Sequence, residues 1–414
     1  MKFSHAAFAV PLILWLAACG ETPAAVDSAA PAGPVPLSAE GDFGATLQGA
    51  LIAAQPGDTI LMPAGTFALS DSLSLDVDGV TLRGAGQGET ILDFAQQSGA
   101  GEGLLVTSDD VTLVDFAVRD TKGDGIKSKG ADRITYRYLT VEWSGEPDET
   151  NGAYGVYPVE SKDVLIENVT VRGASDAGIY VGQSSNIIVR NSIAEFNVAG
   201  IEIENSTGAD VYGNVARNNT GGILVFDLPN LPVMGGSATR IYANEIVANN
   251  TRNFAPAGNI VAGVPSGTGV IIMANRNVHV FDNTFASNRS AHVLINAYSL
   301  PFTDENYNPL PRDIVLRANR YTGGGDDAQG MLAPLAAAMG GQLPPIVWDG
   351  VTQWPGSELA DVNLTIAEAE EVGFLNLGLG AYPLELSRLQ PSPVRPASAA
   401  PAEPAAIILP QDKP

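Results

Sequence analysis

Cysteine and histidine are nearly absent from this chain of 414 residues, which contains one cysteine and three histidines. The single cysteine, Cys19, excludes an intrachain disulfide and any metal cluster built from several thiolates. We therefore predict no metal centre and no bound cofactor, with one calcium alternative that is considered below.

Basic residues are also scarce, with 22 lysines and arginines against 46 aspartates and glutamates and a net charge of −24. Removal of an N-terminal segment that contains Lys2 would leave 21 basic residues and a net charge of −25. A surface this acidic repels phosphate backbones and anionic headgroups. We therefore expect no nucleic-acid partner.

Long hydrophobic runs are confined to the N-terminus, where Lys2 precedes an apolar stretch over residues 6–16. The tetrapeptide at 16–19 resembles a bacterial lipobox, in which Cys19 is the acylated first residue of the mature protein. An ordinary signal peptide is the alternative. No membrane-spanning run follows Cys19, so the lipid would provide the attachment. Gly20 follows the cysteine in place of aspartate, which by analogy with lipoprotein sorting indicates the outer membrane, on its periplasmic face or at the surface.

Composition divides the chain into five predicted segments. They are a lipoprotein signal peptide (1–18), an Ala/Pro-rich tether (19–41), a repeat domain (42–325), a C-terminal cap or extension (326–380) and a Pro/Ala-rich disordered tail (381–414). Asp42 is placed to cap a short amphipathic helix over residues 43–54. We expect this helix to cover the first repeat, whose strand edges and core would otherwise meet water.

The repeat is clearest between Tyr154 and Asn205. Gly155, Gly178 and Gly200 each precede a β-branched residue, at spacings of 23 and 22. Short β-branched strings that recur at this period, separated by Gly, Asn and Ser, are typical of a solenoid with coils of 22–23 residues. We predict an all-β chain of stacked parallel strands that resembles a right-handed parallel β-helix.

Asparagines follow the same period. Asn168 and Asn191 lie 23 residues apart. We predict that this line continues through Asn214, Asn244, Asn283 and Asn319. Stacked asparagines can hydrogen-bond from one coil to the next.

Alternate residues of a strand face opposite ways, so the second and fourth residues after the glycine of each repeat should point outward. The resulting outward pairs are Lys127 and Lys129, Tyr157 and Val159, Tyr180 and Gly182, Glu202 and Glu204, Leu224 and Phe226, and Ile271 and Met273. Insertions at 144–153, 227–237 and 251–267 flank this strand. We expect these insertions to form the walls of a groove, and the loop with Leu228, Leu231 and Met234 to cover the apolar pairs.

Three of the six lysines, Lys122, Lys127 and Lys129, lie within eight residues. Concentrated cations in an acidic chain indicate an anion site, for a uronate carboxylate or a sulfate. The alternative is that they neutralise nearby acids such as Asp120 and Asp124. The same loop also has aspartates at the first and fifth positions of a calcium loop, but Lys122 occupies the third position, where an acid is expected.

Further candidate site residues are Tyr157, Tyr180, Gln183, Glu202 and Glu204. The two tyrosines would lie one coil apart and could stack on a sugar ring. The two glutamates would lie ~6.6 Å apart, which suits an inverting acid/base pair, although such pairs on strands are usually a solvated face.

Two resemblances follow from particular runs. The runs at 56–59, 120–125, 174–183 and 219–229 resemble an uncharacterised family of exported Gram-negative β-helix proteins. This resemblance covers roughly residues 42–349. It implies a lipoprotein or secreted β-helix that is often encoded beside a second exported protein, and it brings no assigned activity.

The broader resemblance is to mannuronan C5-epimerases, whose active strand reads Y-G-x-D-P-H-[DE]. The strand at 154–160 is similar to it, but Tyr157 stands in place of the aspartate and Val159 in place of the histidine. Valine can neither accept a proton nor stabilise a carboxylate. The epimerase mechanism is therefore not carried over.

Two main hypotheses remain. The first is a monomeric, non-catalytic envelope lipoprotein that binds an acidic polysaccharide or a second exported protein. The second is a polysaccharide lyase or epimerase with a changed site, in which Lys127 neutralises a uronate and lowers the pKa of Tyr157 or Tyr180 so that a tyrosine moves the proton. An inverting glycosidase that uses Glu202 and Glu204 is a further alternative.

Overall fold

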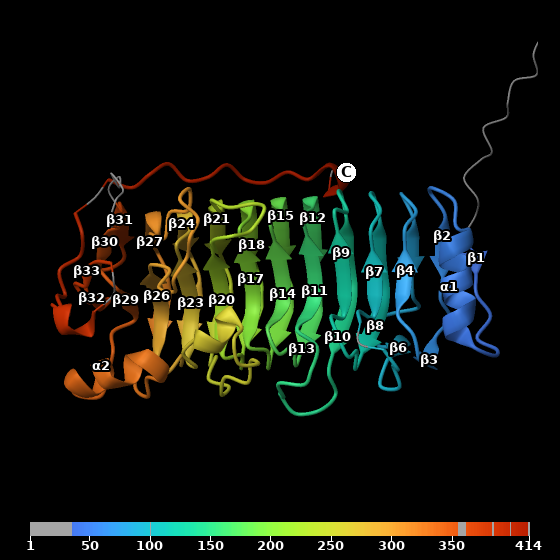
Figure 1. The fold of residues 1–414 in the computed structure, drawn as a ribbon, viewed down its shortest axis with the longest axis horizontal. Coiled ribbons are helices and arrows are strands. Elements are labelled where there is room, and N and C mark those ends of the chain that lie inside the picture. Colours follow the sequence, from blue (N-terminus) through green and yellow to red (C-terminus); the bar gives the residue numbers. More distant parts are fainter. Residues whose placement is uncertain (1–34, 100, 355–361, 383–384, 398, 413–414) are drawn as a thin grey trace, which may run out of the picture. The chain divides into compact units, whose positions relative to one another are not determined.

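The computed structural model describes residues 35–99, 101–354, 362–382, 385–397 and 399–412 (Figure 1). The chain divides into units 1–31 and 32–414, and the first unit lies outside the described residues. The predicted signal peptide and Cys19 are therefore not described. Within the described residues, no helix is both long and apolar enough to cross a membrane.

Short parallel strands form the core of the second unit, and one sheet contains eleven of them in coil order. We call this sheet face 1. Its strands are β4 (Leu73–Leu75), β7 (Leu104–Val106), β9 (Ile126–Lys129), β11 (Tyr154–Val159), β14 (Ala177–Gly182), β17 (Ala199–Glu204), β20 (Gly221–Phe226), β23 (Thr268–Met273), β26 (Ala291–Asn296), β29 (Ile346–Trp348) and β32 (Phe374–Asn376).

A second sheet of twenty strands forms two columns. The first column, face 2, contains β1 (Val35–Pro36), β2 (Thr59–Leu61), β5 (Thr81–Arg83), β8 (Thr112–Arg119), β10 (Thr135–Glu142), β12 (Lys162–Glu167), β15 (Ser185–Arg190), β18 (Thr207–Tyr212), β21 (Ser237–Tyr242), β24 (Arg276–Phe281), β27 (Arg312–Arg317) and β31 (Leu364–Ala367). The second column, face 3, contains the C-terminal halves of β8 and β10 with β3 (Gly65–Ala68), β6 (Thr90–Asp93), β13 (Thr170–Arg172), β16 (Ile193–Glu195), β19 (Val215–Arg217), β22 (Glu245–Val247), β25 (Thr284–Ala286) and β28 (Arg320–Thr322). The prediction of an all-β parallel solenoid is confirmed.

The predicted inward register is also confirmed. Ile179 pairs with Ile201 and Val181 with Ile203 on adjacent strands of face 1. All four side chains are fully buried. The inward residues of successive coils therefore form continuous apolar files, which are the main stabilising feature of the stack.

The asparagine ladder forms, but the predicted line combined two neighbouring positions. Asn214 accepts from the backbone of Ser192, and Asn244, Asn283 and Asn319 continue this pattern one coil at a time. Asn168 and Asn191 lie one residue earlier in their coils, in left-handed turns with φ of 54° and 53°. A second ladder, missed from the sequence, runs through Asn197, Asn219, Asn249 and Asn288.

Helix α1 (Phe43–Ala53) forms the predicted N-terminal cap. The Asp42 side chain accepts a hydrogen bond from the Ala45 amide at 3.0 Å, as an N-cap does. The helix buries Phe43, Leu47 and Leu51. The Phe43 ring stacks on Phe67 of β3 at 3.8 Å. The apolar face of the helix thus covers the first coil.

The C-terminal region adds α2 (Ala333–Ala338) and a two-stranded sheet of β30 (Val351–Gln353) and β33 (Gly380–Ala381). In the described part of the chain, 3₁₀ turns lie at Ile260–Gly263, Gly330–Leu332, Leu386–Arg388 and Pro410–Asp412. Pro334 lies in the first turn of α2, where its missing amide is tolerated, so it does not break the helix.

The end of the chain differs from the expected disordered tail. Residues 399–412 run in an extended path across face 2, back toward β12, in the red segment of Figure 1. Glu403 forms an ion pair with Arg317, and Asp412 forms one with Arg190. Contacts with residues far away in the sequence, which composition cannot reveal, give this segment its path.

Candidate functional site

The outward residues of face 1 lie where the repeat predicted them. Lys127 pairs with Tyr157 across β9 and β11, and Tyr180 pairs with Glu202 across β14 and β17. Further along, Glu204 pairs with Phe226 on β20. The predicted order of cationic, aromatic, acidic and apolar side chains is therefore present on the outer side of this sheet.

From β14 onward, however, this outer side is covered rather than open. Glu202 and Leu224 are 1% and 0% exposed. Loops that follow β20, β22 and β26 fold over the sheet and bury their own apolar side chains. These are Leu228, Phe254, Val261, Val264, Tyr298, Tyr307 and Leu310. The covering of the apolar pairs agrees with our expectation, but the open groove past the glutamates does not exist.

The three predicted lysines have different surroundings. Lys127 Nζ lies 3.2 Å from Glu102 Oε1 and 3.5 Å from Asp124 Oδ2. Lys129 Nζ lies 3.8 Å from Glu160 Oε1, and the Lys129 side chain is 57% exposed. The Lys122 side chain is exposed as well. Lys127 thus lies between two neighbouring acids, whereas Lys129 meets one acid and, like Lys122, is exposed to solvent.

The expected calcium loop uses its aspartates in other ways. Both Asp120 carboxylate oxygens accept from Ser144, one from its amide and one from its hydroxyl, at 2.7 Å each. Asp124 faces Lys127. Among the described residues, no group of three or more His, Cys, Asp or Glu side chains is arranged to hold a metal ion.

A cluster of three tyrosines marks the boundary between the open and covered parts of face 1. The Tyr154 ring lies 4.5 Å from Tyr157 and 4.6 Å from Tyr180, and the latter two meet edge to face at 4.9 Å. Lys127 Nζ lies 4.8 Å from the Tyr157 ring centroid. The cation therefore occupies one side of the ring that we expected to stack on sugar.

Three buried carboxyl groups lie beside the tyrosines. Tyr180 donates a hydrogen bond to Glu204 Oε1 at 2.7 Å, and Asn259 donates to Asp176 Oδ2 at 2.9 Å. Glu202 Oε2 is buried without a partner. Asp176 was not predicted as a site residue from the sequence. It meets Asn259 only after the loop that carries Asn259 has folded over the sheet.

Burial makes these carboxyl groups weak acids. Desolvation raises the pKa of Asp176 and of Glu204 to about 7 each. It raises the pKa of Glu202 well above its usual range, with the charge of Glu204 as the next cause. At neutral pH the cluster therefore holds protons that exposed carboxylates would have lost.

The pKa values of the tyrosines are raised as well. Desolvation raises the pKa of Tyr157 to about 12 and that of Tyr180 well above its usual value. The expectation that lysines lower a tyrosine pKa is therefore wrong, because burial and nearby carboxylates outweigh Lys127. A tyrosinate base is disfavoured here.

Two other predicted roles are not supported by the geometry. Gln183 Oε1 accepts from the Val233 amide at 3.3 Å and so binds a covering loop. Glu202 and Glu204 point outward as expected, but at 1% and 8% exposure they have no space for the sugar and water of an inverting mechanism.

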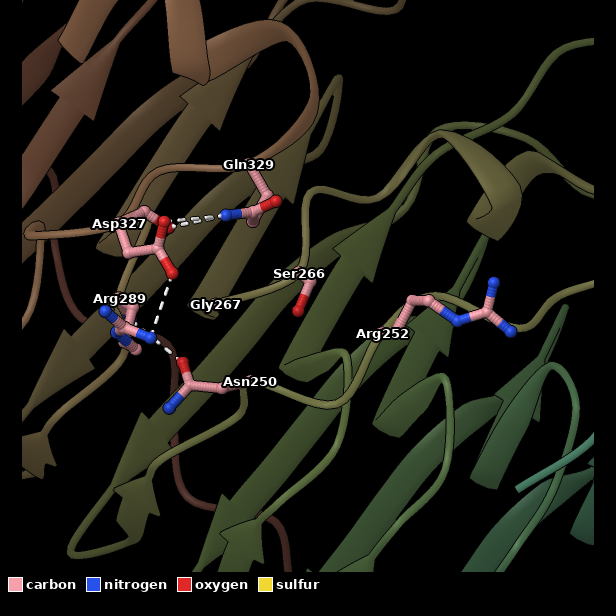
Figure 2. A pocket seen from close by; sticks show the side chains of 7 residues that line it. All are labelled: Asn250, Arg252, Ser266, Gly267, Arg289, Asp327 and Gln329. Atoms are coloured by element: carbon pink, nitrogen blue, oxygen red, sulfur yellow. Dashed lines mark hydrogen bonds and ion pairs between the residues drawn. The ribbon is translucent and has the colours of Figure 1, made fainter. Parts of the chain in front are cut away.

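A separate cavity of about 160 Å³ lies away from these residues (Figure 2). Its lining consists of Asn250, Arg252, Ser266, Gly267, Arg289, Asp327 and Gln329. Arg289 forms an ion pair with Asp327 at 2.9 Å, and Gln329 donates to the same carboxylate. In Figure 2 the Arg252 side chain points away from this pair. Because most of these polar groups bind one another, the cavity is not the candidate site.

Comparisons with known proteins concern the fold. No curated protein matches this sequence. Among solved structures, the chain is similar to the mannuronan C-5 epimerase AlgE4 A-module of Azotobacter vinelandii, at 14% identity and TM-score 0.48, over 82% of this chain and 93% of that one. It is also similar to an alginate lyase from a Paenibacillus species, at 18% identity and TM-score 0.44, over 70% and 97%. The catalytic unit of an α-1,3-glucanase from Streptomyces thermodiastaticus matches at 17% identity and TM-score 0.46, over 82% and 54%.

At these identities and TM-scores, no activity is carried over to this chain. The family model that matches covers residues 78–234 and is described as "Right handed beta helix region". This match supplies the hand of the coil, which the spacing of the repeat left open. The stacked parallel strands described above therefore form a right-handed parallel β-helix.

Proposed function

We propose that this protein binds an acidic carbohydrate chain on the outer side of face 1, across β7, β9 and β11. The supporting observation is that the loops that cover face 1 leave the outer side of β7, β9 and β11 open. Leu105, Lys127 and Tyr157 remain partly exposed and Lys129 is exposed, whereas the outward residues from Tyr180 to Leu294 are buried. The next insertion, at 144–153, is itself largely exposed beside this strip.

The charges assign different roles to the lysines in this proposal. Lys122 and Lys129 are the cations that would meet carboxylates or sulfates of the ligand, because both are exposed. Lys127 holds Tyr157 in place and is neutralised by Glu102 and Asp124. Charge-assisted hydrogen bonds are the strongest contacts that such a surface can offer an acidic glycan.

The test measures binding of polymannuronate, with uncharged dextran as the control ligand, by calorimetry at several salt concentrations. Replacing both Lys122 and Lys129 with Met keeps their apolar stems and removes the charges. We expect roughly tenfold weaker binding or more and a flatter salt dependence, since each charge-assisted bond contributes about 1.5–3 kcal/mol.

The matched control is Lys162→Met, an exposed lysine on face 2 that should not change binding. The proposal is refuted if the wild type does not bind polymannuronate, or if the control weakens binding as much as the double variant does. Tyr157→Ala should weaken binding without changing its salt dependence.

One observation favours a second candidate function, a lyase or epimerase. Burial raises the pKa of Asp176 to about 7, and its carboxyl group accepts a hydrogen bond from Asn259 at 2.9 Å. A carboxyl group of this kind can accept or donate a proton at neutral pH. Incubation with polymannuronate should then give unsaturated uronate absorbance or a changed C5 configuration by NMR, and Asp176→Asn should abolish either product. If no product forms, this candidate is excluded and the binding proposal stands.

The cellular location is part of the proposal. We propose that Cys19 carries a lipid that holds the protein in the cell envelope at the outer membrane. The support is the sequence at 16–20.

A further inference from the structure

Face 2 carries a row of outward side chains that are buried although they do not belong to the core inside the coils. Leu165 pairs with Ile188, and the same row continues to Asp210, Arg240, His279 and Val315. Leu165, Ile188, His279 and Val315 are each 3% exposed or less. Leu165 and Ile188 form a hydrophobic cluster of their own, apart from the main core.

The segment at 399–412 covers this row. Leu409 is fully buried against Leu165 and Ile188, and Ile407 packs on the same cluster. Ile408, between them, is 77% exposed. The alternation shows that the segment lies on face 2 as an extended chain with one apolar edge inward.

Two acidic residues anchor this segment near its ends. Glu403 receives hydrogen bonds from Arg317 at 2.7 Å and from Arg240 at 3.1 Å. Asp412 binds Arg190 with both oxygens, at 2.7 and 2.8 Å. A bidentate pair such as that of Asp412 with Arg190 adds geometric specificity as well as energy.

The arginines are held in place without the segment. The rings of Tyr212, Tyr242 and Phe281 stack in a row at 4.8 and 5.0 Å. Arg240 lies over Tyr242, and Arg317 lies over Phe281. Arg190 also binds Glu167 of β12 at 2.9 Å. The coils alone therefore position the groups that receive Glu403 and Asp412.

The segment itself makes few backbone bonds to the coils. Residues 399–409 form no described strand, and the Ile407 amide bonds to the Asp210 side chain at 3.0 Å. Because the segment completes no sheet, its release would leave the ladders of face 2 intact. A segment held mainly by side chains can open at lower cost than the strands beneath it.

We propose that face 2 from β12 to β27 is a binding groove for an extended peptide, occupied in this chain by its own C-terminus. The ligand that it fits has an acidic residue at each end, nine positions apart, and two inward apolar residues between them, as Glu403, Ile407, Leu409 and Asp412 provide. The groove would accept the same peptide from a second copy when its own segment is released.

The experiment uses a fluorescent peptide of residues 399–414 and two forms of the full chain. The wild type should bind the peptide weakly, because its groove is filled. A released form with Glu403→Lys, Leu409→Asp and Asp412→Lys should bind it at least tenfold more tightly. The released form with Arg190→Glu added should lose this gain.

The control peptide carries Leu409→Asp and Asp412→Lys and should bind neither form. Circular dichroism and melting of the released form check that its coils remain folded. The proposal fails if a folded released form does not bind the peptide, or if the wild type binds it equally well.

If the released form does not fold, hydrogen exchange on the wild type and on Arg190→Glu decides the question. A docked but releasable segment predicts that exchange of the Ile407 amide rises at least tenfold in Arg190→Glu while amides of β15 and β18 stay protected. Unchanged exchange at Ile407, or equal loss of protection in the strands, would overturn the proposal.

Discussion

Individual side chains on this β-helix take their chemistry from the coil and covering loop around them. Glu204 and Glu160 are both glutamates beside the tyrosine cluster, yet Glu204 is 8% exposed and bound to Tyr180, whereas Glu160 is exposed and meets Lys129. Desolvation disfavours the charged form of Glu204 and leaves it a proton donor near neutral pH. Its burial therefore implies a measurable pH dependence of stability.

We predict that the protein becomes less stable as the pH rises from about 4.5 to about 7. The pKa of Glu204 is about 7 in the folded protein, against 4.5 for an ordinary glutamate. Over this range the folded chain keeps a proton that the unfolded chain releases, so the free energy of unfolding falls as pH rises. Glu204→Gln should make this pH-dependent decrease in the free energy of unfolding smaller by on the order of 2 kcal/mol.

Urea unfolding at pH 5 and pH 8 measures this effect. Glu245→Gln, at an exposed position of β22, is the control and should keep the wild-type pH dependence. Equal slopes for wild type and Glu204→Gln would show that Glu204 is ionised in the folded state. Asp176 and Glu202 should preserve part of the slope, because burial raises the pKa of each of them too.

Individual strands in this fold are short, and polar ladders at the turns join one coil to the next. Asn244 illustrates the arrangement, since its side chain accepts from Asn214 and donates to Val211 and Asn283. Every one of these groups is buried between coils. A ladder residue is therefore worth more than an isolated hydrogen bond, because its loss leaves buried groups without partners.

Asn244→Ala should lower the free energy of unfolding by roughly 3 kcal/mol, since it removes buried hydrogen bonds to Asn214, Val211 and Asn283 and leaves the buried Asn214 amide without its acceptor. Asn306→Ala, in an exposed loop, should stay within about 0.5 kcal/mol of the wild type. Chemical denaturation of the two variants tests the ladder. A loss as small as that of the control would mean that water replaces the missing side chain.

At the scale of the whole molecule, the three faces of the coil are used differently. Face 1 is covered by loops from β14 onward and open near β9, and face 2 is crossed by the C-terminal segment. Face 3 carries alternating charges such as Arg172, Glu195 and Arg217, which form ion pairs with one another. The proposed glycan site and the proposed peptide groove thus occupy separate faces, and their tests are independent.

Lipid attachment is the remaining prediction at this scale. Metabolic labelling with a clickable fatty acid should mark the wild-type protein and fail to mark Cys19→Ala, because Cys19 supplies the only thiol of the chain. In cell fractionation, the wild-type protein should be recovered in the outer-membrane fraction and the variant should not. Equal labelling of both proteins would rule out this attachment.

The stacking of the coils could be predicted from the sequence because it depends on local and periodic features. Ile179 and Ile201 lie one coil apart, and a strand alternates its faces with a period of two. The helix at the N-terminus was readable for the same reason, from Asp42 and the apolar spacing after it. The candidate residues Lys127, Tyr157, Tyr180, Glu202 and Glu204 were placed correctly on the outer side of face 1.

Only the tertiary structure decided which of these outward residues are exposed. The loops that bury Glu202 have no period, and they are held by contacts such as Tyr307 to the Asp227 carbonyl, 80 residues apart. The C-terminal segment follows face 2 because of pairs such as Arg190 with Asp412, 222 residues apart. Periodicity determines where a coil repeats, but the free energy of a loop or tail depends on the surface that it finds after the coils have stacked.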